Sequence, residues 1–248
     1  MRAIIADIHA NLEALRVVLK EVNARKVDEV VCLGDIIGYG PDPVRCLDAA
    51  MRFTWSLMGN HEEGLLFPEQ GERYSERARA SLDWTRGLLE DPGNPANGKR
   101  WDFLGELPDR KIEGDVIYVH GSPRRPRNEY IKPSLAADRA AMEELFATFE
   151  HVAFVSHTHW PGAMTLAEGW RTPSELGNEY TITDEKVIVN VGAVGQPRDG
   201  NPRACLCLFD GQTVIWRRIQ YNVEATQSKI LANPELDDSL AERLAEGR

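Results

Sequence analysis

Five short apolar runs, each ended by a small group of polar residues, constrain the fold of this chain more than any other feature. The runs AIIA, VVCL, WSLM, VIYV and HVAFVS are typical of buried strands in an α/β sheet. The polar clusters that end them are Asp7-Ile8-His9, Gly34-Asp35, Gly59-Asn60-His61-Glu62, His120-Gly121 and His157-Thr158-His159. Because these clusters hold five of the six histidines, we expect one polar centre at the strand ends, with His151 apart from it as a structural or surface residue.

Helical segments separate these strands. Asn11 is a predicted N-cap for a helix whose apolar stripe includes Leu12 and Leu15, and Asp42-Pro43 predicts a second helix to about residue 50. A third helix is expected over 75–89, before the breaker-rich stretch 90–98, and a fourth over 134–149, opened by Ser134. The alternation of strand and helix up to residue 156 predicts a doubly wound α/β architecture.

The chain changes character after Ala163. Short strands with hairpin signals follow, including a turn at Asp210-Gly211, and these predict a second, largely antiparallel sheet. From Val223 we expect one or two amphipathic surface helices, broken near Asn233-Pro234.

Composition excludes several classes of protein. The formal net charge of −10 over 248 residues argues against binding of duplex nucleic acid, which needs a basic face. The N-terminus lacks a signal-peptide core and no apolar run approaches a membrane-spanning length, so we expect a soluble, cytoplasmic protein without a membrane contact. The four cysteines, which include no C-x-x-C pair, are expected to be reduced packing residues. The oligomeric state is left open.

The polar clusters have the spacing of metal ligands. In an extended segment residues i and i+2 point the same way, so Asp7 with His9, and His157 with His159, can each reach one ion. Two carboxylates, one amide and four imidazoles suit Mn, Fe, Zn, Co or Ni better than Ca or Mg. This candidate ligand set is Asp7, His9, Asp35, Asn60, His120, His157 and His159. It is too large for one tetrahedral ion, so we expect two divalent transition-metal ions that share a bridge.

The order D-x-H, G-D, G-N-H-E, H-G and H-x-H resembles the calcineurin-like metallophosphoesterase superfamily over nearly the whole chain. The segments GDIIGYGPDP at 34–43, NVGAVGQPRDGNPRA at 190–204 and YNVEAT at 221–226 resemble its compact bacterial phosphodiesterase-type members. The resemblance implies a four-layer α/β/β/α sandwich of two mixed sheets flanked by helices. It also implies one domain over 1–248, with an inserted helical lobe at about 64–114 and a helical tail at about 223–248.

The resemblance also implies a role for each residue of the site. Asp7, His9, Asp35 and His159 would hold one ion, and Asp35, Asn60, His120 and His157 the other, with Asp35 as the bridge. The catalytic residues would be His61, which contacts substrate and gives a proton to the leaving oxygen, and Asn60, which also touches phosphate. The implied reaction is in-line attack of a metal-bridging hydroxide on a small or nucleotide-like phosphodiester.

Departures from the family pattern refine this hypothesis. Protein phosphatases and bis-nucleoside tetraphosphatases of the superfamily typically carry G-D-x-V-D-R-G, but Gly38 and Tyr39 stand where that pattern has Asp and Arg. This chain therefore lacks the carboxylate that supports the histidine and the arginine that binds phosphate through two hydrogen bonds. Their absence argues against both of those activities and favours a phosphodiesterase. A phosphomonoesterase and a non-catalytic scaffold with the same fold remain the alternatives. Ala10 and Ser156 stand where glycine is usual.

Substrate contacts are less specific in the sequence. We take Arg124, Arg125 and Tyr39 as candidate substrate-binding residues, although the basic loop SPRRPRNEY can equally be a solvated surface.

Two arginines and one tryptophan are further candidates for substrate contacts. Arg198 and Arg203 either approach substrate or pair with local acids such as Asp199. Trp160, directly after His159, is a weak candidate for stacking on a nucleobase, whereas Trp84 and Trp101 are expected in the core.

Overall fold

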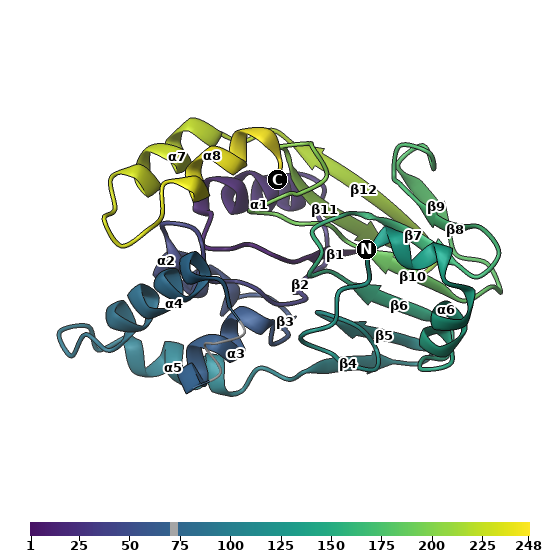
Figure 1. The fold of residues 1–248 in the computed structure, drawn as a ribbon, viewed down its shortest axis with the longest axis horizontal. Helices are drawn as coiled ribbons and strands as arrows, with labels where there is room; N and C mark the ends of the chain where they lie inside the picture. Colours follow the sequence, from purple (N-terminus) through teal and green to yellow (C-terminus); the bar gives the residue numbers. More distant parts are fainter. Residues whose placement is uncertain (70–73) are drawn as a thin grey trace.

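A computed structural model describes residues 1–69 and 74–248 and shows two six-stranded mixed sheets packed face to face (Figure 1). The first sheet has the order β3 (Trp55–Ser56), β2 (Glu29–Cys32), β1 (Arg2–Ile5), β11 (Ala204–Phe209), β12 (Thr213–Ile219) and β9 (Glu179–Thr181). The second has the order β4 (Arg110–Glu113), β5 (Val116–Val119), β6 (Val152–Val155), β10 (Val187–Asn190), β7 (Gly162–Thr165) and β8 (Gly169–Arg171).

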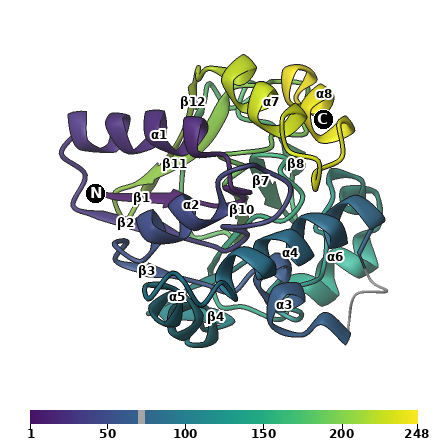
Figure 2. The ribbon, with the colours of Figure 1, turned by 90° about the vertical axis from the view of Figure 1, so that its left-hand side faces the viewer.

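Helices cover the outer faces of this sandwich. They are α1 (Leu12–Ala24), α2 (Pro43–Ala50), α3 (Asn60–Leu66), α4 (Glu76–Leu89), α5 (Asn97–Gly105), the 3-10 helix η2 (Pro133–Ala137), α6 (Arg139–Phe146), α7 (Val223–Leu231) and α8 (Ser239–Glu246). Figures 1 and 2 show α1, α7 and α8 grouped on one side of the strands and α2 to α5 gathered on another. The predicted four-layer α/β/β/α sandwich is therefore confirmed.

Alternating side chains build the layers. On β1, Ala3 and Ile5 face the core under α1 and α2, whereas Ile4 points between the sheets. There Ile4 belongs to the same buried cluster as Tyr118 of β5 and Phe154 of β6. A third cluster packs α6 against the outer face of the second sheet. Period-two alternation thus places one helical layer on each outer face and an apolar interface between the sheets.

The expectation of a separate antiparallel sheet after residue 163 is wrong. Strands β9, β11 and β12 join the first sheet, where β11 pairs antiparallel with β1, and β7, β8 and β10 join the second, where β10 pairs parallel with β6. The hairpin at Asp210-Gly211 is confirmed, with β11 and β12 antiparallel and Gly211 at φ +108°. Burial agrees with the observed strand order, because β10, which is buried along its whole length, lies in the interior of the second sheet between β6 and β7.

Helix boundaries agree with the sequence in two places and differ in others. The side chain of Asn11 accepts the N-cap bond of α1, as predicted, and α4 begins directly after Ser75, whose side chain caps it. The single helix expected from Ser134 is wrong: η2 comes first, and the side chain of Asp138 accepts from Ala141 N at 3.0 Å to start α6. Asp42 stands at the N-cap of α2, but its side chain bonds to Lys229 of α7 instead of capping.

The remaining segments frame the site. The stretch 64–114 holds the end of α3, then α4 and α5, and ends in β4, which pairs with β5 of the second sheet. Helix α5 begins at Asn97, inside the breaker-rich stretch for which no helix was predicted. The tail forms α7 and α8 on either side of Asn233-Pro234, as expected.

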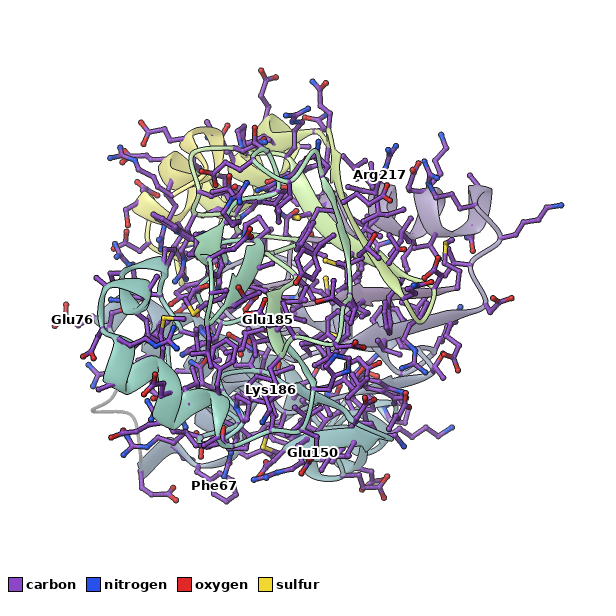
Figure 3. The ribbon with its side chains drawn as sticks, turned by 90° about the vertical axis from the view of Figure 1, so that its right-hand side faces the viewer. Phe67, Glu76, Glu150, Glu185, Lys186 and Arg217 are labelled. Carbon is purple, nitrogen blue, oxygen red and sulfur yellow. The ribbon has the colours of Figure 1, made fainter. Side chains whose placement is uncertain are left out.

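Smaller features secure the outer layers. All four cysteines are free and buried, which agrees with a packing role. Lys186 (labelled in Figure 3) precedes β10, and its Nζ donates to the carbonyls of Phe146 and Phe149 at 3.0 and 2.6 Å, where α6 ends. Among the described residues, none of the helices has both the length and the apolar character needed to cross a bilayer.

Candidate metal centre and substrate cavities

The predicted ligand residues meet at the carboxyl ends of five strands. Asp7 and His9 follow β1, Asp35 follows β2, Asn60 follows β3, His120 follows β5, and His157 and His159 follow β6. All seven side chains are buried. Their donor atoms form two groups, Asp7, His9, Asp35 with His159, and Asp35, His120 with His157. Within each group the atoms lie within 4.8 Å of one another, and Asp35 belongs to both.

Main-chain carbonyls orient three of the imidazoles. His9 Nδ1 lies 3.1 Å from Ile37 O, His120 Nδ1 lies 3.1 Å from Leu33 O, and His159 Nδ1 contacts Gln196 O. Each Nδ1–H donates to its carbonyl, so in its neutral form each ring turns the lone pair of Nε2 toward the centre. This is the orientation a metal-ligating histidine needs.

The lone pairs then face one another without a proton between them. His9 Nε2 lies 3.2 Å from His159 Nε2, and Asp7 Oδ1 lies 3.2 Å from the same His159 atom. Within the described residues, neither carboxylate oxygen of Asp7 has a hydrogen-bond partner. Such an arrangement of donors is repulsive unless a cation lies among them. The residues present therefore fit bound metal ions.

Charge at the second group supports the same conclusion. Burial, the largest single cause, lowers the pKa of His120, but the charge and hydrogen bond of Asp35, 3.3 Å from its Nε2, together with Asp7 and Glu62 raise that pKa to about 9. A proton thus holds the place between His120 and Asp35 that a metal ion would take. Asn60 Oδ1 and His157 Nδ1 lie 3.1 and 3.0 Å from the same Nε2, so both can reach that ion.

The loops that carry the centre are strained. Seven residues of these loops have φ between +46° and +63°, the left-handed region: Asp7, His9, Ala10, Asp35, Tyr39, His157 and His159. Side chains other than glycine rarely adopt this conformation, and it persists where surrounding contacts enforce it. Ala10 shows why glycine is usual at its position. Ser156, the other replaced glycine, puts its Oγ 3.1 Å from His120 Nδ1.

Glu62 holds the loop that carries Asp35 in this conformation, although no role for Glu62 was predicted from the sequence. Its buried carboxylate accepts from the main-chain N–H groups of Asp35, Ile36, Ile37 and Gly59 at 2.8 to 3.2 Å. With four donors around it, an added proton would have no acceptor, so we assign Glu62 as ionised. Its place in the G-N-H-E motif was the available signal, but its partners lie up to 27 residues away.

His61 lies beside the metal ligands and against residues 38 and 39. A Cβ at Gly38 would stand 2.0 Å from His61 Nδ1, so only glycine leaves room for the ring. The Tyr39 ring contacts both His61 and His9, with centroids 4.6 and 4.8 Å apart. Burial is the main cause that lowers the pKa of His61 to about 4. The ring is therefore neutral in the free protein at pH 7.

Two cavities open beside the centre. The larger, of about 710 Å³, has among its lining residues Tyr39, Asn60, Tyr74, Arg125, Tyr130 and His157. The smaller, of about 450 Å³, is lined by Tyr130, Lys132, Pro133, Ser134, Thr158, Trp160 and Arg198. Tyr130 lines both and stacks on His157, with ring centroids 3.8 Å apart. The two cavities are therefore neighbours, and the residue they share lies against a candidate metal ligand.

The arginines of the basic loop SPRRPRNEY differ in whether they reach a cavity or pair with a carboxylate. Arg125 lines the larger cavity, whereas Arg124 is held by Glu129, with Nη2 2.7 Å from its Oε1, and is absent from the described lining of either cavity. Arg127 lines the larger cavity but pairs with Glu63 at 2.7 Å.

The later arginines also separate. Arg198 reaches the smaller cavity. Arg203 bonds to Asn201. Asp199 pairs with Arg218, and in the described structure neither Arg198 nor Arg203 pairs with it.

The other residues in question lie in ordinary environments. His151 bonds to Asp115 and to Thr183 O, away from the centre, as expected. Trp101 Nε1 donates to Leu89 O, and Trp84 packs against the α7–α8 cluster. Trp160 differs, because 42% of it is exposed at the smaller cavity.

Comparison with known proteins agrees with this geometry. The model of the calcineurin-like phosphoesterase family matches residues 2–189. The chain is 34% identical over 253 residues to the uncharacterized protein MJ0912 of Methanocaldococcus jannaschii, covering 100% of this chain and 98% of that protein. A crystal structure of a metallophosphoesterase from Sphaerobacter thermophilus is 34% identical, with a TM-score of 0.79 and coverage of 100% and 99% of the two chains. The hypothetical protein PH1004 from Pyrococcus horikoshii OT3, 18% identical over 100% of this chain and 99% of that one, shares the fold with a TM-score of 0.78.

The chain therefore belongs to the calcineurin-like phosphoesterase family. Its buried cluster of Asp and His residues is able to hold metal ions.

Proposed function

We propose that this protein is a dimetal phosphodiesterase that hydrolyses a small or nucleotide-like phosphodiester. The observation that carries the proposal is the pair of donor groups that share Asp35, beside two cavities that share Tyr130 in their lining. A diester has two organic substituents, and two neighbouring cavities would offer each of them a place. The absence of an arginine at residue 39 supports a diester over the phosphatase substrates of the wider superfamily.

The proposed ligands are those predicted from the sequence. Asp7, His9, Asp35 and His159 would hold one ion and Asp35, Asn60, His120 and His157 the other. When bound, two divalent ions supply a hydroxide nucleophile at neutral pH and neutralise charge on the phosphoryl oxygens. The mixed nitrogen and oxygen donors favour Mn, Fe, Zn, Co or Ni.

His61 and Asn60 would act directly on the substrate. Burial keeps the His61 ring neutral in the free protein, and a bound anion beside it raises its affinity for a proton. The ring then gives that proton to the leaving alkoxide, a step worth about 10² to 10⁴ in rate. Asn60, between His120 and the larger cavity, contacts a phosphoryl oxygen through its amide N–H. Tyr39 and Arg125 line that cavity and would contact the substituent.

The test is hydrolysis of bis(p-nitrophenyl) phosphate and of p-nitrophenyl phosphate after loading with Mn²⁺. We expect faster turnover of the diester, and a loss of about 10² to 10⁴ in kcat for His61→Ala at unchanged metal content. Preference for the monoester would replace the proposal with a phosphomonoesterase. Inertness toward both esters at two metal ions per chain would favour a non-catalytic scaffold.

A further inference from the structure

Arg198 lies on a turn whose Gln196 also hydrogen-bonds to the candidate metal ligand His159. This turn follows β10, and its Gln196 accepts from His159 Nδ1 through the main-chain oxygen and from Arg198 Nη2, at 2.9 Å, through the side chain. The main-chain N–H of Arg198 points back to His159 O at 3.5 Å. One turn therefore sets the position of the guanidinium relative to the metal centre.

The guanidinium lies over the residue that occupies the usual arginine position. Arg198 Cζ is 6.0 Å from the centre of the Tyr39 ring, and that ring packs on His9 and His61. Arg198 thus approaches the same space from a different part of the chain, 159 residues further along. It also lines the smaller cavity together with Tyr130, which stacks on His157.

Arg198 has no carboxylate partner within 4.0 Å among residues 1–69 and 74–248, whereas Arg124 and Arg127 are each paired with a glutamate. Its Nε is buried and has no hydrogen-bond partner in that part of the chain.

An unpaired, partly buried cation is unfavourable unless an anion is there to bind. A guanidinium presents several N–H donors in one plane, which matches two oxygens of a phosphate better than an ammonium does. Gln196 occupies one Nη2 proton, and the buried Nε–H has no partner in the described structure. Tyr39 supplies a flat face that fixes the plane of the group.

We propose that Arg198 binds the non-bridging oxygens of the substrate phosphate where the two cavities meet, in place of the arginine that residue 39 lacks. This inference rests on the proposed phosphoesterase function. It makes the turn after β10, beyond the family match at residues 2–189, a part of the substrate site.

The experiment compares Arg198→Ala and Arg198→Lys with Arg203→Ala in the full-length, Mn²⁺-loaded protein. Arg203 is exposed, and in the described structure its guanidinium bonds to Asn201 within its own turn, so it controls for loss of a positive charge from the same loop. Binding of inorganic phosphate is measured by calorimetry, metal content by elemental analysis, and the kinetics with bis(p-nitrophenyl) phosphate. We expect Arg198→Ala to weaken phosphate binding about 10- to 100-fold. Arg198→Lys should restore part of the affinity, and Arg203→Ala should match the wild type, all at unchanged metal content.

Phosphate binding by Arg198→Ala within twofold of the wild type would overturn the inference, even if the diester is hydrolysed as proposed. Loss of metal from both Arg198 variants would also overturn it, because the residue would then support the fold of the centre. If the wild type hydrolyses neither ester but binds phosphate in an Arg198-dependent way, the inference stands and the proposed diesterase activity fails.

Discussion

At the scale of single residues, the absence of a side chain at residue 38 decides where His61 lies. Gly38 has φ +85°, and its missing Cβ would coincide with the imidazole. His61 Nδ1 is buried without a hydrogen-bond partner in the described structure. The ring packs against Tyr39 and Gly38, and Asp35 bonds to the main-chain N–H of His61 at 2.9 Å while its carboxylate lies 4.0 Å from Nε2 of the ring. Its position should be sensitive to small changes in the volume of these neighbours.

Gly38→Ala should separate this effect from backbone strain. Both Gly38 and Gly114 have positive φ, but a Cβ at Gly114 meets nothing within 4 Å. Each alanine should destabilise the fold by about 1 to 2 kcal/mol through the left-handed backbone. Gly38→Ala should also displace His61 and lower kcat for the diester about 10²-fold, since a shift of about 1 Å has effects of that size.

Thermal unfolding and steady-state kinetics of the two variants check this prediction. Equal activity of Gly38→Ala and Gly114→Ala would show that the contact between residue 38 and His61 is unimportant for turnover.

The ligand residues were predictable from the sequence because each one directly follows an apolar run, and the ends of parallel strands meet at one edge of a sheet. Glu62 was given no role, and for Arg198 the choice between substrate and a local acid stayed open. Glu62 bonds to the main chain of residues 35–37, and Arg198 lies over a ring 159 positions earlier. Contacts of this kind depend on the folded path of the chain, and no local spacing encodes them.

At the scale of elements, the start of α6 tests how a helix boundary is chosen. Ser134 and Asp138 are both good N-cap residues, but Pro133 favours the tighter turn η2, and only Asp138 accepts a cap bond from α6. Asp138→Ala should lower the free energy of unfolding by about 1 kcal/mol. Ser134→Ala, the matched control, should change it by less than about 0.5 kcal/mol. Chemical denaturation of both variants measures the difference; a larger effect at Ser134 would restore the boundary expected from the sequence.

Strand existence was easier to predict than strand pairing. Apolar runs mark the buried strands, whereas β4, β8 and β9 lack them. The sequence pattern assigned the later strands to a sheet of their own, but they extend both sheets. Pairing depends on which edges remain open once β1, β2 and β3 have formed one sheet and β5 and β6 the other. The resemblance to the family, and not periodicity, predicted the mixed sheets.

At the scale of the whole molecule, the C-terminal helices support the centre from behind. Leu240 and Leu244 of α8 are buried in a cluster that includes Ile230 of α7 and packs against Tyr39. Leu240→Ala should cost about 2 to 4 kcal/mol of stability and, by loosening Tyr39, reduce kcat/KM at unchanged metal content. Leu231→Ala, in the same helix pair but 56% exposed, should have little effect on either quantity. Retention of full kcat/KM by a destabilised Leu240→Ala would show that the tail serves stability alone.

Asp7→Asn should stabilise the protein without metal and lose that advantage when metal is bound. Without metal, the buried Asp7 carboxylate faces the lone pair of His159 Nε2 at 3.2 Å and lacks a hydrogen-bond partner in the described structure. In Asp7→Asn an amide N–H can donate to that nitrogen and the buried charge is gone, so in chelator the variant should be more stable than the wild type by about 1 to 3 kcal/mol. With Mn²⁺ at about a thousand times its dissociation constant, the wild type should gain about 4 kcal/mol, and the variant, which has lost a ligand, should gain less.

Unfolding in urea, with and without metal, measures both differences, and Asp184→Asn at an exposed bend is the control that should follow the wild type in each condition. If Asp7→Asn lowered stability equally with and without metal, the carboxylate would be stabilised by the protein itself. The lone pairs that face each other across the centre would then need another explanation than a bound cation.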